Sequence, residues 1–171
     1  MSISRAARFG GISLAAALLF GPGVAWADNP HFISATDSVQ SDGDLLVQWK
    51  EAGLGSSVTI AYDISATGQS FCNCVTKGGT CPSAQNKTTG SQLISVPATF
   101  TSTKAGNING SATLMAPACP TSSPPTCGKG QTLEVTSVTW SDPTVKDTTT
   151  PVGPFPATPT SQTVEFVVCG K

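Results

Sequence analysis

The chain has 171 residues, with nine Lys and Arg, ten Asp and Glu, and a single His. A near-neutral balance excludes a strongly basic nucleic-acid-binding protein. Charged residues make up only 11% of the sequence, while Gly, Pro, Ser and Thr are frequent; this composition favours short strands joined by turns over long helices.

Residues 1–27 have the three parts of a cleavable signal peptide. Two cations, Arg5 and Arg8, precede an apolar run at 12–20, and the small-residue triplet Ala25-Trp26-Ala27 follows. A membrane span needs about 20 apolar residues, and this run has barely half of them. We therefore predict cleavage after Ala27, secretion to the extracellular space, and no membrane span in the mature protein.

The remaining residues, 28–171, are enough for one domain with a real core. This part contains no Arg, seven Lys and ten carboxylates, which gives a formal charge of −3. Arg is the residue best suited to bidentate contacts with phosphate. Its absence, together with the negative charge, argues against nucleic acid or anionic lipid as a partner.

The hydrophobic pattern after residue 28 has a period of two almost throughout, which is typical of half-buried strands. The third predicted strand is the clearest, because Val58, Ile60, Tyr62 and Ile64 alternate with polar residues. Residues 66–91 and 141–160 are predicted to be long loops. The seven predicted strands are His31–Asp37, Asp44–Lys50, Ser57–Ser65, Leu93–Thr101, Ile108–Leu114, Thr132–Trp140 and Gln162–Cys169.

Seven short alternating strands with turn residues between them predict an all-β fold. We expect an immunoglobulin-like antiparallel β-sandwich that forms a single domain. The Cys…Trp…Cys spacing of true immunoglobulin domains is missing, so only the architecture is predicted. A closed barrel is the alternative.

Six cysteines follow the predicted cleavage point, and an even number in an exported chain predicts three disulfides. Loop length favours Cys119 with Cys127. Cys72 and Cys74 are not expected to pair with each other: one is expected to reach Cys81, and the other to tie down the last strand through Cys169. A metal site on Cys72, Cys74 and Cys81 is disfavoured, because there is no second C-x-x-C pair and only one His. We expect no metal and no cofactor.

The acid and base residues do not assemble into a catalytic motif. His31 has no nucleophile motif to serve and is expected at the edge of the first strand. The carboxylates of Asp37, Asp42 and Asp44 crowd the first turn, but their spacing does not fit a calcium loop. A glycosidase pair could be drawn only from the three glutamates, and two of them fall on the predicted solvent face of their strands. The glutamates are Glu51, Glu134 and Glu165.

Three aromatic residues, Trp49, Tyr62 and Trp140, could form a ligand-binding platform. Their phase within the predicted strands instead favours a core role for all three. Two glycosylation sequons begin at Asn86 and Asn109, and such sequons are common by chance.

Short segments of the chain resemble small secreted proteins of unknown function from high-GC Gram-positive bacteria, of the actinomycete type. The first is Asn29-Pro-His-Phe32, followed by the stretch Val47–Gly55. The likeness continues in Ala84-x-Asn86-Lys87 and in Gly106-x-Ile108-x-Gly110-Ser111. It implies secretion and supplies no activity.

A fainter resemblance is architectural. Secreted apoproteins of the neocarzinostatin type are also small, acidic, disulfide-linked seven-stranded sandwiches, and they hold an aromatic chromophore in a cleft. The cysteine layout of this chain does not match that family's two short disulfide loops.

These observations predict an extracellular binding or structural module without catalytic activity. Its partner would be an extracellular protein, a glycan or a small molecule, and the loops at 66–91 and 141–160 would be the contact surface. The alternatives are a small-ligand carrier and an inhibitor of extracellular proteases that presents the region between Cys119 and Cys127. A hydrolase ranks last.

Overall fold

The computed structural model describes residues 29–82, 87–122, 124–150, 152–167 and 169, and within them it contains strands and no helix. The all-β prediction is therefore confirmed. The predicted signal peptide lies outside the described residues. In the described part no helix is long and apolar enough to cross a membrane. The strands are β1 (His31–Val39), β2 (Leu45–Ala52), β3 (Thr59–Thr76), β4 (Lys87–Thr101), β5 (Ile108–Leu114), β6 (Gln131–Asp147), β7 (Phe155–Pro156) and β8 (Ser161–Glu165).

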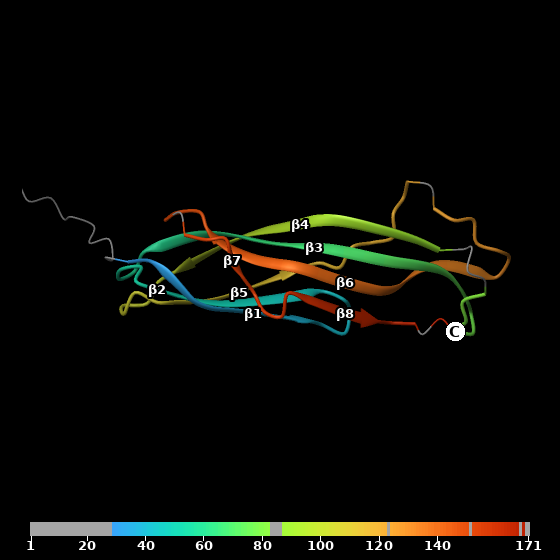
Figure 1. Cartoon of the computed structure of the whole chain (residues 1–171), viewed down its shortest axis with the longest axis horizontal. Coiled ribbons are helices and arrows are strands. Elements are labelled where there is room, and N and C mark those ends of the chain that lie inside the picture. The colour runs from blue at the N-terminus through green and yellow to red at the C-terminus, as the bar shows by residue number, and fades with distance from the viewer. Residues whose placement is uncertain (1–28, 83–86, 123, 151, 168, 170–171) are drawn as a thin grey trace, which may run out of the picture.

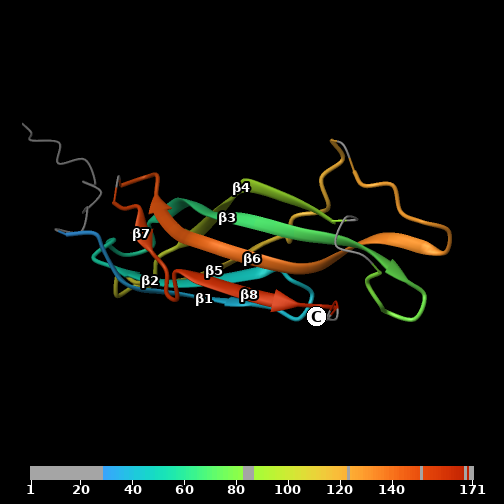
Figure 2. The ribbon, with the colours of Figure 1, turned by 45° about the vertical axis from the view of Figure 1, so that its right-hand side comes forward.

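The strands form two antiparallel sheets, as predicted for an immunoglobulin-like sandwich. The smaller sheet has the order β1-β2-β5, and the larger has the order β4-β3-β6-β7, with β8 also paired to β6. Figures 1 and 2 show the two layers, with β3, β4 and β6 extending well beyond the smaller sheet. In the constant-type immunoglobulin order the fourth strand joins the first sheet, whereas here β4 pairs with β3.

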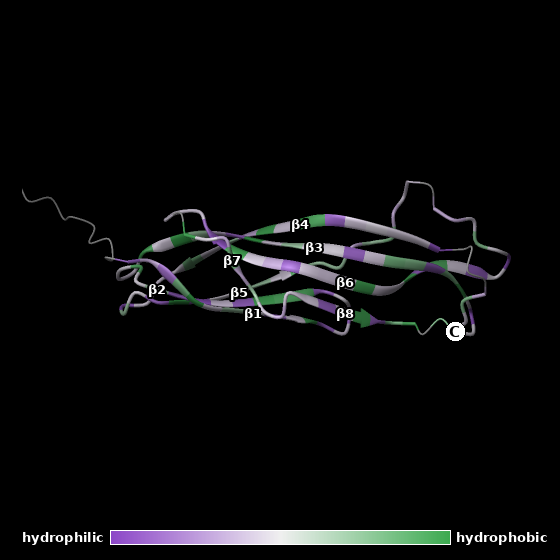
Figure 3. Cartoon of the chain, in the orientation of Figure 1, coloured by the Kyte–Doolittle hydropathy of each residue, from purple (hydrophilic) through white to green (hydrophobic). Residues whose placement is uncertain are grey.

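The strands form because apolar residues recur at every second position. In β2 the buried residues Leu45, Val47 and Trp49 alternate with partly or fully exposed ones, so one side chain in two enters the core. In β3 the same alternation buries Ile60, Tyr62 and Ile64 and is visible as alternating bands of hydropathy along the large sheet (Figure 3).

The predicted loop at 66–91 is wrong over most of its length. β3 continues to Thr76 and β4 begins at Lys87, so only residues 77–86 separate the two strands. The prediction failed because the inward positions of this stretch are small or are cysteines, which produce no apolar alternation. β6 likewise runs to Asp147 and shortens the second predicted loop, whereas β8 ends at Glu165, before the predicted Cys169.

Five aromatic rings pack together between the two sheets at one end of the sandwich. The Trp49 ring lies 5.0 Å from that of Tyr62 and 5.4 Å from that of Phe100, and the Phe32 and Phe155 rings stack at 5.4 Å. Such contacts add to the stabilisation from burial. Gly110 lies beside Trp49 on the neighbouring strand, and a Cβ there would approach the indole to 2.3 Å. We call this part the aromatic end.

One side of the sandwich is closed by the segment between β7 and β8. The Ala157 N–H donates to the Pro143 carbonyl on β6 at 2.8 Å, and the Asp37 N–H on β1 donates to the Thr158 carbonyl at 3.1 Å. These bonds connect the two sheets across the edge of the core.

Candidate functional site

At the other end of the molecule β3, β4 and β6 continue without the smaller sheet beneath them. Their inner face is covered by the segment 115–120, which follows β5 and which we call the covering segment. The Ser70 hydroxyl on β3 donates to the Ala118 carbonyl at 2.9 Å. A Cβ on Gly90 would lie 3.0 Å from Cγ of Pro120, so the glycine allows the covering segment to approach the sheet closely.

Three disulfides join this part of the molecule, and their pairing differs from the prediction. Cys72 pairs with Cys119, Cys74 with Cys127 and Cys81 with Cys169. The predicted Cys119–Cys127 bridge is therefore wrong, and so are the predicted bridges from Cys72 and Cys74 to Cys81 and Cys169. Loop length favoured that short bridge. The decisive fact is that Cys72 and Cys74, two residues apart on one strand, face the same side and both reach the chain that crosses beneath them.

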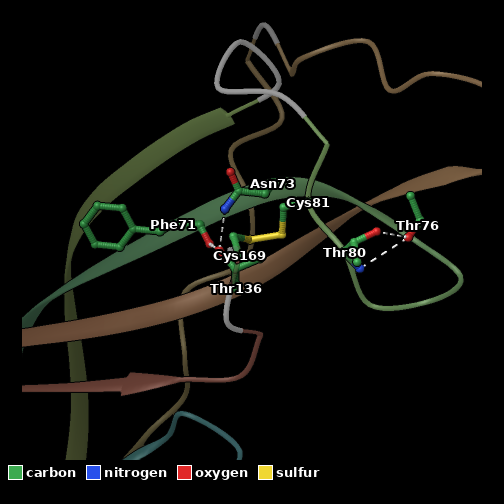
Figure 4. The surroundings of a disulfide bond; sticks show 7 residues. All are labelled: Phe71, Asn73, Thr76, Thr80, Cys81, Thr136 and Cys169. Atoms are coloured by element: carbon green, nitrogen blue, oxygen red, sulfur yellow. Dashed lines mark hydrogen bonds between the residues drawn. A yellow bond between two sulfur atoms is a disulfide. The ribbon is translucent and has the colours of Figure 1, made fainter. Parts of the chain in front are cut away.

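The third disulfide connects the turn after β3 with the region after β8 (Figure 4). Close to it, the Asn73 amide donates to the Thr136 hydroxyl at 2.7 Å, and that hydroxyl donates to the Phe71 carbonyl at 3.1 Å. Within the turn the Thr76 and Thr80 hydroxyls lie 2.8 Å apart. Side-chain hydrogen bonds and a disulfide thus hold this turn in place.

The first two disulfides also fix both ends of an exposed loop. Residues 121–126, which we call the tethered loop, leave the sheet at Cys119 and return at Cys127, and their anchors on β3 are two residues apart. Thr121, Ser122, Pro124 and Thr126 are exposed. We call the extension of β3, β4 and β6, the covering segment and the tethered loop together the braced end.

Shallow grooves are found on the surface of the described residues. One, of about 380 Å³, lies between β4 and the covering segment and is lined by Ser, Thr, Gly, Pro, Gln, Ala and Cys residues. A second, of about 350 Å³, lies near Cys169 and includes Phe71 and Lys87; a third, of about 400 Å³, lies on the polar outer face of β1, β2 and β5. The first and third linings are mainly polar, whereas the second includes the apolar side chains of Phe71 and Val167 beside charged ones.

A second cluster of interest is buried at the aromatic end. Glu51 and Asp147 are both fully buried, and the Tyr62 hydroxyl donates to Glu51 Oε2 at 2.6 Å. The Asp147 carboxylate accepts hydrogen bonds from the Thr149 and Thr150 N–H groups at 2.7 and 2.9 Å. Asp147 thereby shapes the turn after β6.

The environment of Glu51 disfavours the charged form of its carboxyl. Burial raises its pKa from 4.5 to about 7; the Tyr62 hydrogen bond opposes that rise, and the neighbouring Asp147 charge adds to it. Glu51 Oε1 has no hydrogen-bond partner among the described residues. Because the core encloses this carboxyl, its ionisation affects the stability of the fold, and the group is not accessible to a substrate.

The structure separates Glu51 from the other two glutamates. Glu51 is buried at the aromatic end, whereas Glu134 and Glu165 are exposed. Glu134 pairs with Asn73 at the braced end, far along β3 from Tyr62, the partner of Glu51. The arrangement therefore does not bring Glu51 together with Glu134 as a glycosidase pair. Sequence reasoning missed the burial of Glu51, although its phase with Leu45, Val47 and Trp49 was a usable signal.

The predicted polar candidates form hydrogen bonds within the fold, some local and some between distant segments. His31 is exposed at the start of β1, and its Nδ1 donates to the Asn29 carbonyl at 2.8 Å. Asp42 accepts from the Asp44 N–H at 3.1 Å, Asp44 from the Ala116 N–H at 2.7 Å, and Asp37 from the Gln162 amide. Among the described residues no three His, Cys, Asp or Glu side chains gather to hold a metal ion.

The predicted core role of the aromatic residues is confirmed. Trp49, Tyr62 and Trp140 are each at most 3% exposed. The Trp140 indole N–H donates to the Gly43 carbonyl at 2.8 Å, which satisfies its polar atom inside the core. Of the two sequons, Asn109 is exposed on β5, and Asn86 lies outside the described residues.

Comparisons with protein-family models, with curated proteins and with solved structures gave no match. The six cysteines form three disulfides that indicate an oxidising environment. Together with the fold and the braced end, they are the basis for the functional conclusion.

Proposed function

We propose that the protein is a secreted extracellular binding module without catalytic activity, and that it contacts its partner through the braced end. The observation that carries this proposal is the position of the disulfides. All three lie at one end, and two of them fix both ends of the exposed tethered loop. Loops held on a rigid scaffold commonly carry recognition, and prior ordering lowers the entropic cost of binding.

The proposed surface is more compact than the sequence analysis suggested. Residues 77–82 follow the C-terminal end of β3, whereas residues 148–150 and 152–160 follow Asp147, which pairs with Tyr62 near the start of β3. The two predicted contact loops therefore lie at opposite ends of a strand of 18 residues. Only the first lies at the same end of the sandwich as the braced end.

The partner class is an extracellular protein or glycan. The braced end presents mainly Ser, Thr and Pro residues with isolated charges such as Lys129. A surface of this composition offers hydrogen bonds and gives little electrostatic steering. Secretion follows from the predicted signal peptide at residues 1–27 and agrees with the disulfides.

A matched pair of double variants tests the proposal. Thr121→Glu with Lys129→Glu changes the charge of the braced end, and Ser56→Glu with Lys104→Glu makes the same charge change in exposed turns at the aromatic end. Oxidised protein would be immobilised and incubated with secreted proteins and cell-wall polysaccharide of the producing cells, and binding to each fraction measured.

We expect wild type and the Ser56/Lys104 variant to bind one fraction alike, and the Thr121/Lys129 variant to bind it at least five-fold less. Equal binding by both variants would place the contact surface elsewhere, and no binding by wild type would reject the module. Sensitivity of the bound material to protease or to glycosidase distinguishes a protein from a glycan.

One observation favours a second candidate, an inhibitor of extracellular proteases. A protease-binding loop must stay extended and ordered, and the tethered loop is exposed and held by disulfides at both ends. Inhibition of subtilisin-like or trypsin-like enzymes at nanomolar protein would establish this function. Rapid cleavage within residues 121–126 without inhibition would reject it.

A further inference from the structure

The groove between β4 and the covering segment lies along a free sheet edge. β4 is the outermost strand of the large sheet. Consecutive residues of β4, from Thr89 to Gln92, line the groove. Because successive side chains of a strand point to opposite faces, a groove lined by all of them runs along the edge of the strand.

The backbone of β4 directs unused hydrogen-bonding groups to this edge. N–H and C=O groups of alternate strand residues point to opposite sides. The Thr148 N–H donates to the Ala61 carbonyl at 2.9 Å, so the odd-numbered residues of β3 face β6. The register pairs Gln69 with Ser91, and Ser91 therefore directs its N–H and C=O away from β3.

Pro97 supports the same assignment. It occupies an odd-numbered position of β4, opposite Asp63, and it has no N–H to donate. Proline is tolerated in a sheet where the missing N–H would point to a free edge. In the part of the chain that the structure describes, Thr89 and Ser91 form no backbone hydrogen bond to a segment outside the sheet.

The facing wall of the groove is held in place. Cys119 is bonded to Cys72, and the Ser70 hydroxyl donates to the Ala118 carbonyl at 2.9 Å. The groove measures about 380 Å³, and none of its lining residues is charged. An occupant is thus bounded by a fixed wall on one side and a strand edge on the other.

Both walls lead to an exposed hydrophobic side chain. Leu93 directly follows the lining residue Gln92, and Met115 lies two residues before the lining residue Pro117. Each is 73% exposed, which makes them the most exposed large hydrophobic residues in the described ranges. Leu93 lies on the outer face of the sheet, because the even-numbered Ile94 and Val96 pack against the core.

We propose that this groove binds an extended, uncharged segment of another polypeptide, which adds to the large sheet as a strand beside β4. The inference rests on the proposed function and specifies its partner as a protein. The free N–H and C=O groups of alternate β4 residues recognise an extended backbone. The uncharged lining disfavours a charged segment, because its ions would lose water without a compensating partner.

The probe is a phage-displayed library of random nine-residue peptides, selected on the oxidised protein, followed by affinity measurement with the best synthetic peptide. Ser91→Pro removes the edge N–H inside the groove, and Thr99→Pro is the matched control at an odd-numbered position outside it. Both substitutions put proline at an odd-numbered position of β4, where, as at Pro97, the missing N–H would point away from β3. Both variants should therefore fold, which circular dichroism checks.

We expect selected peptides with few charges, at least ten-fold weaker binding to Ser91→Pro, and binding within two-fold of wild type to Thr99→Pro. Hydrogen exchange on the wild-type complex is a readout that does not depend on the variants. The amides of Thr89 and Ser91 should gain protection, and that of Thr99 should not.

Equal binding to all three proteins, or no change in exchange at Thr89 and Ser91, would overturn the strand inference. A wild-type dimer that Ser91→Pro dissociates would also overturn it, because the occupant would then be a second copy. The proposed module is judged separately by its own charge variants. If the Thr121/Lys129 variant loses binding while Ser91→Pro still binds the natural partner, the proposed binding module is supported and the strand inference is wrong.

Discussion

The two ends of the sandwich are stabilised in different ways. At the aromatic end, two sheets enclose five packed rings, and large side chains fill the space between the layers. At the braced end a single sheet meets a covering segment across small residues such as Gly90 and Ser70, and disulfides hold the layers together. The braced end buries too little apolar surface for hydrophobic burial to stabilise it as it stabilises the aromatic end.

This difference explains how the covering segment and the exposed tethered loop are kept ordered. A covering segment without strand pairing has few backbone bonds to hold it, and its loop would lose considerable entropy on ordering. A disulfide reduces that cost by restricting the unfolded chain. The aromatic end therefore supplies most of the folding free energy, and the braced end supplies an ordered surface.

The largest effect should follow from emptying the aromatic end. Trp49→Ala removes a ring that contacts both Tyr62 and Phe100, and we expect a loss of about 4 kcal/mol in the free energy of unfolding. Chemical denaturation measures this value. Ile33→Ala, at a half-exposed position on β1, is the control and should cost far less.

Removal of one disulfide should have a somewhat smaller and more local effect. Cys74→Ala with Cys127→Ala opens a bridge that spans 53 residues, and we expect a loss of about 3 kcal/mol. Limited proteolysis should then cut the tethered loop much faster, while near-ultraviolet circular dichroism of the aromatic end stays unchanged. A change in the aromatic signal as large as that in Trp49→Ala would contradict the separation of the two ends.

The sequence predicted the aromatic end far better than the braced end. The alternation around Val47 and Trp49, and that around Ile60 and Tyr62, indicates strands and core directly, because large apolar residues alternate with polar ones. In residues 68–76 the inward positions are Gly, Ser and Cys, whose burial depends on a segment some 50 residues away. No local pattern can carry that information.

The pairing of the cysteines was unpredictable for the same reason. Cys72 and Cys74 lie on the same face of β3, and their partners belong to the segment that crosses beneath that face. This segment is part of the long connection from β5 to β6, so its position cannot be read from the local sequence around β3. The groove beside β4 depends on the same crossing. Glu51, by contrast, could have been recognised as inward from its phase.

The aromatic end should also make stability depend on pH. In the folded protein the pKa of Glu51 is raised from 4.5 to about 7, so the neutral form is the one that folding favours. The contribution of Glu51 to stability is therefore greatest below pH 4.5 and is lost as the pH rises to about 7, by about 3 kcal/mol in all. Denaturation at a series of pH values measures this fall.

Glu51→Gln tests the assignment, because the amide keeps an acceptor for the Tyr62 hydroxyl and cannot ionise. Its stability should change much less between pH 4.5 and 7, whereas the exposed Glu134→Gln should retain the wild-type slope. An unchanged slope in Glu51→Gln would show that another group titrates. The raised pKa of Asp37, due mainly to burial, acts in the same direction.

The smallest effect should come from the exposed hydrophobic residues beside the groove. Leu93→Ser and Met115→Ser should each change the free energy of unfolding by less than about 0.5 kcal/mol, because both side chains are 73% exposed. Thermal unfolding checks this. A clear loss of stability would mean that these side chains support the fold and are not available to a partner.

The most direct test of the account is hydrogen exchange, followed by mass spectrometry, on the oxidised protein and after reduction and alkylation of its cysteines. We predict that reduction strips protection from the covering segment, the tethered loop and the parts of β3, β4 and β6 near Cys72 and Cys74, while β2 and the start of β3 around Trp49 and Tyr62 remain protected. Equal loss of protection at both ends, or none at the braced end, would contradict the claim that the braced end depends on its disulfides for order.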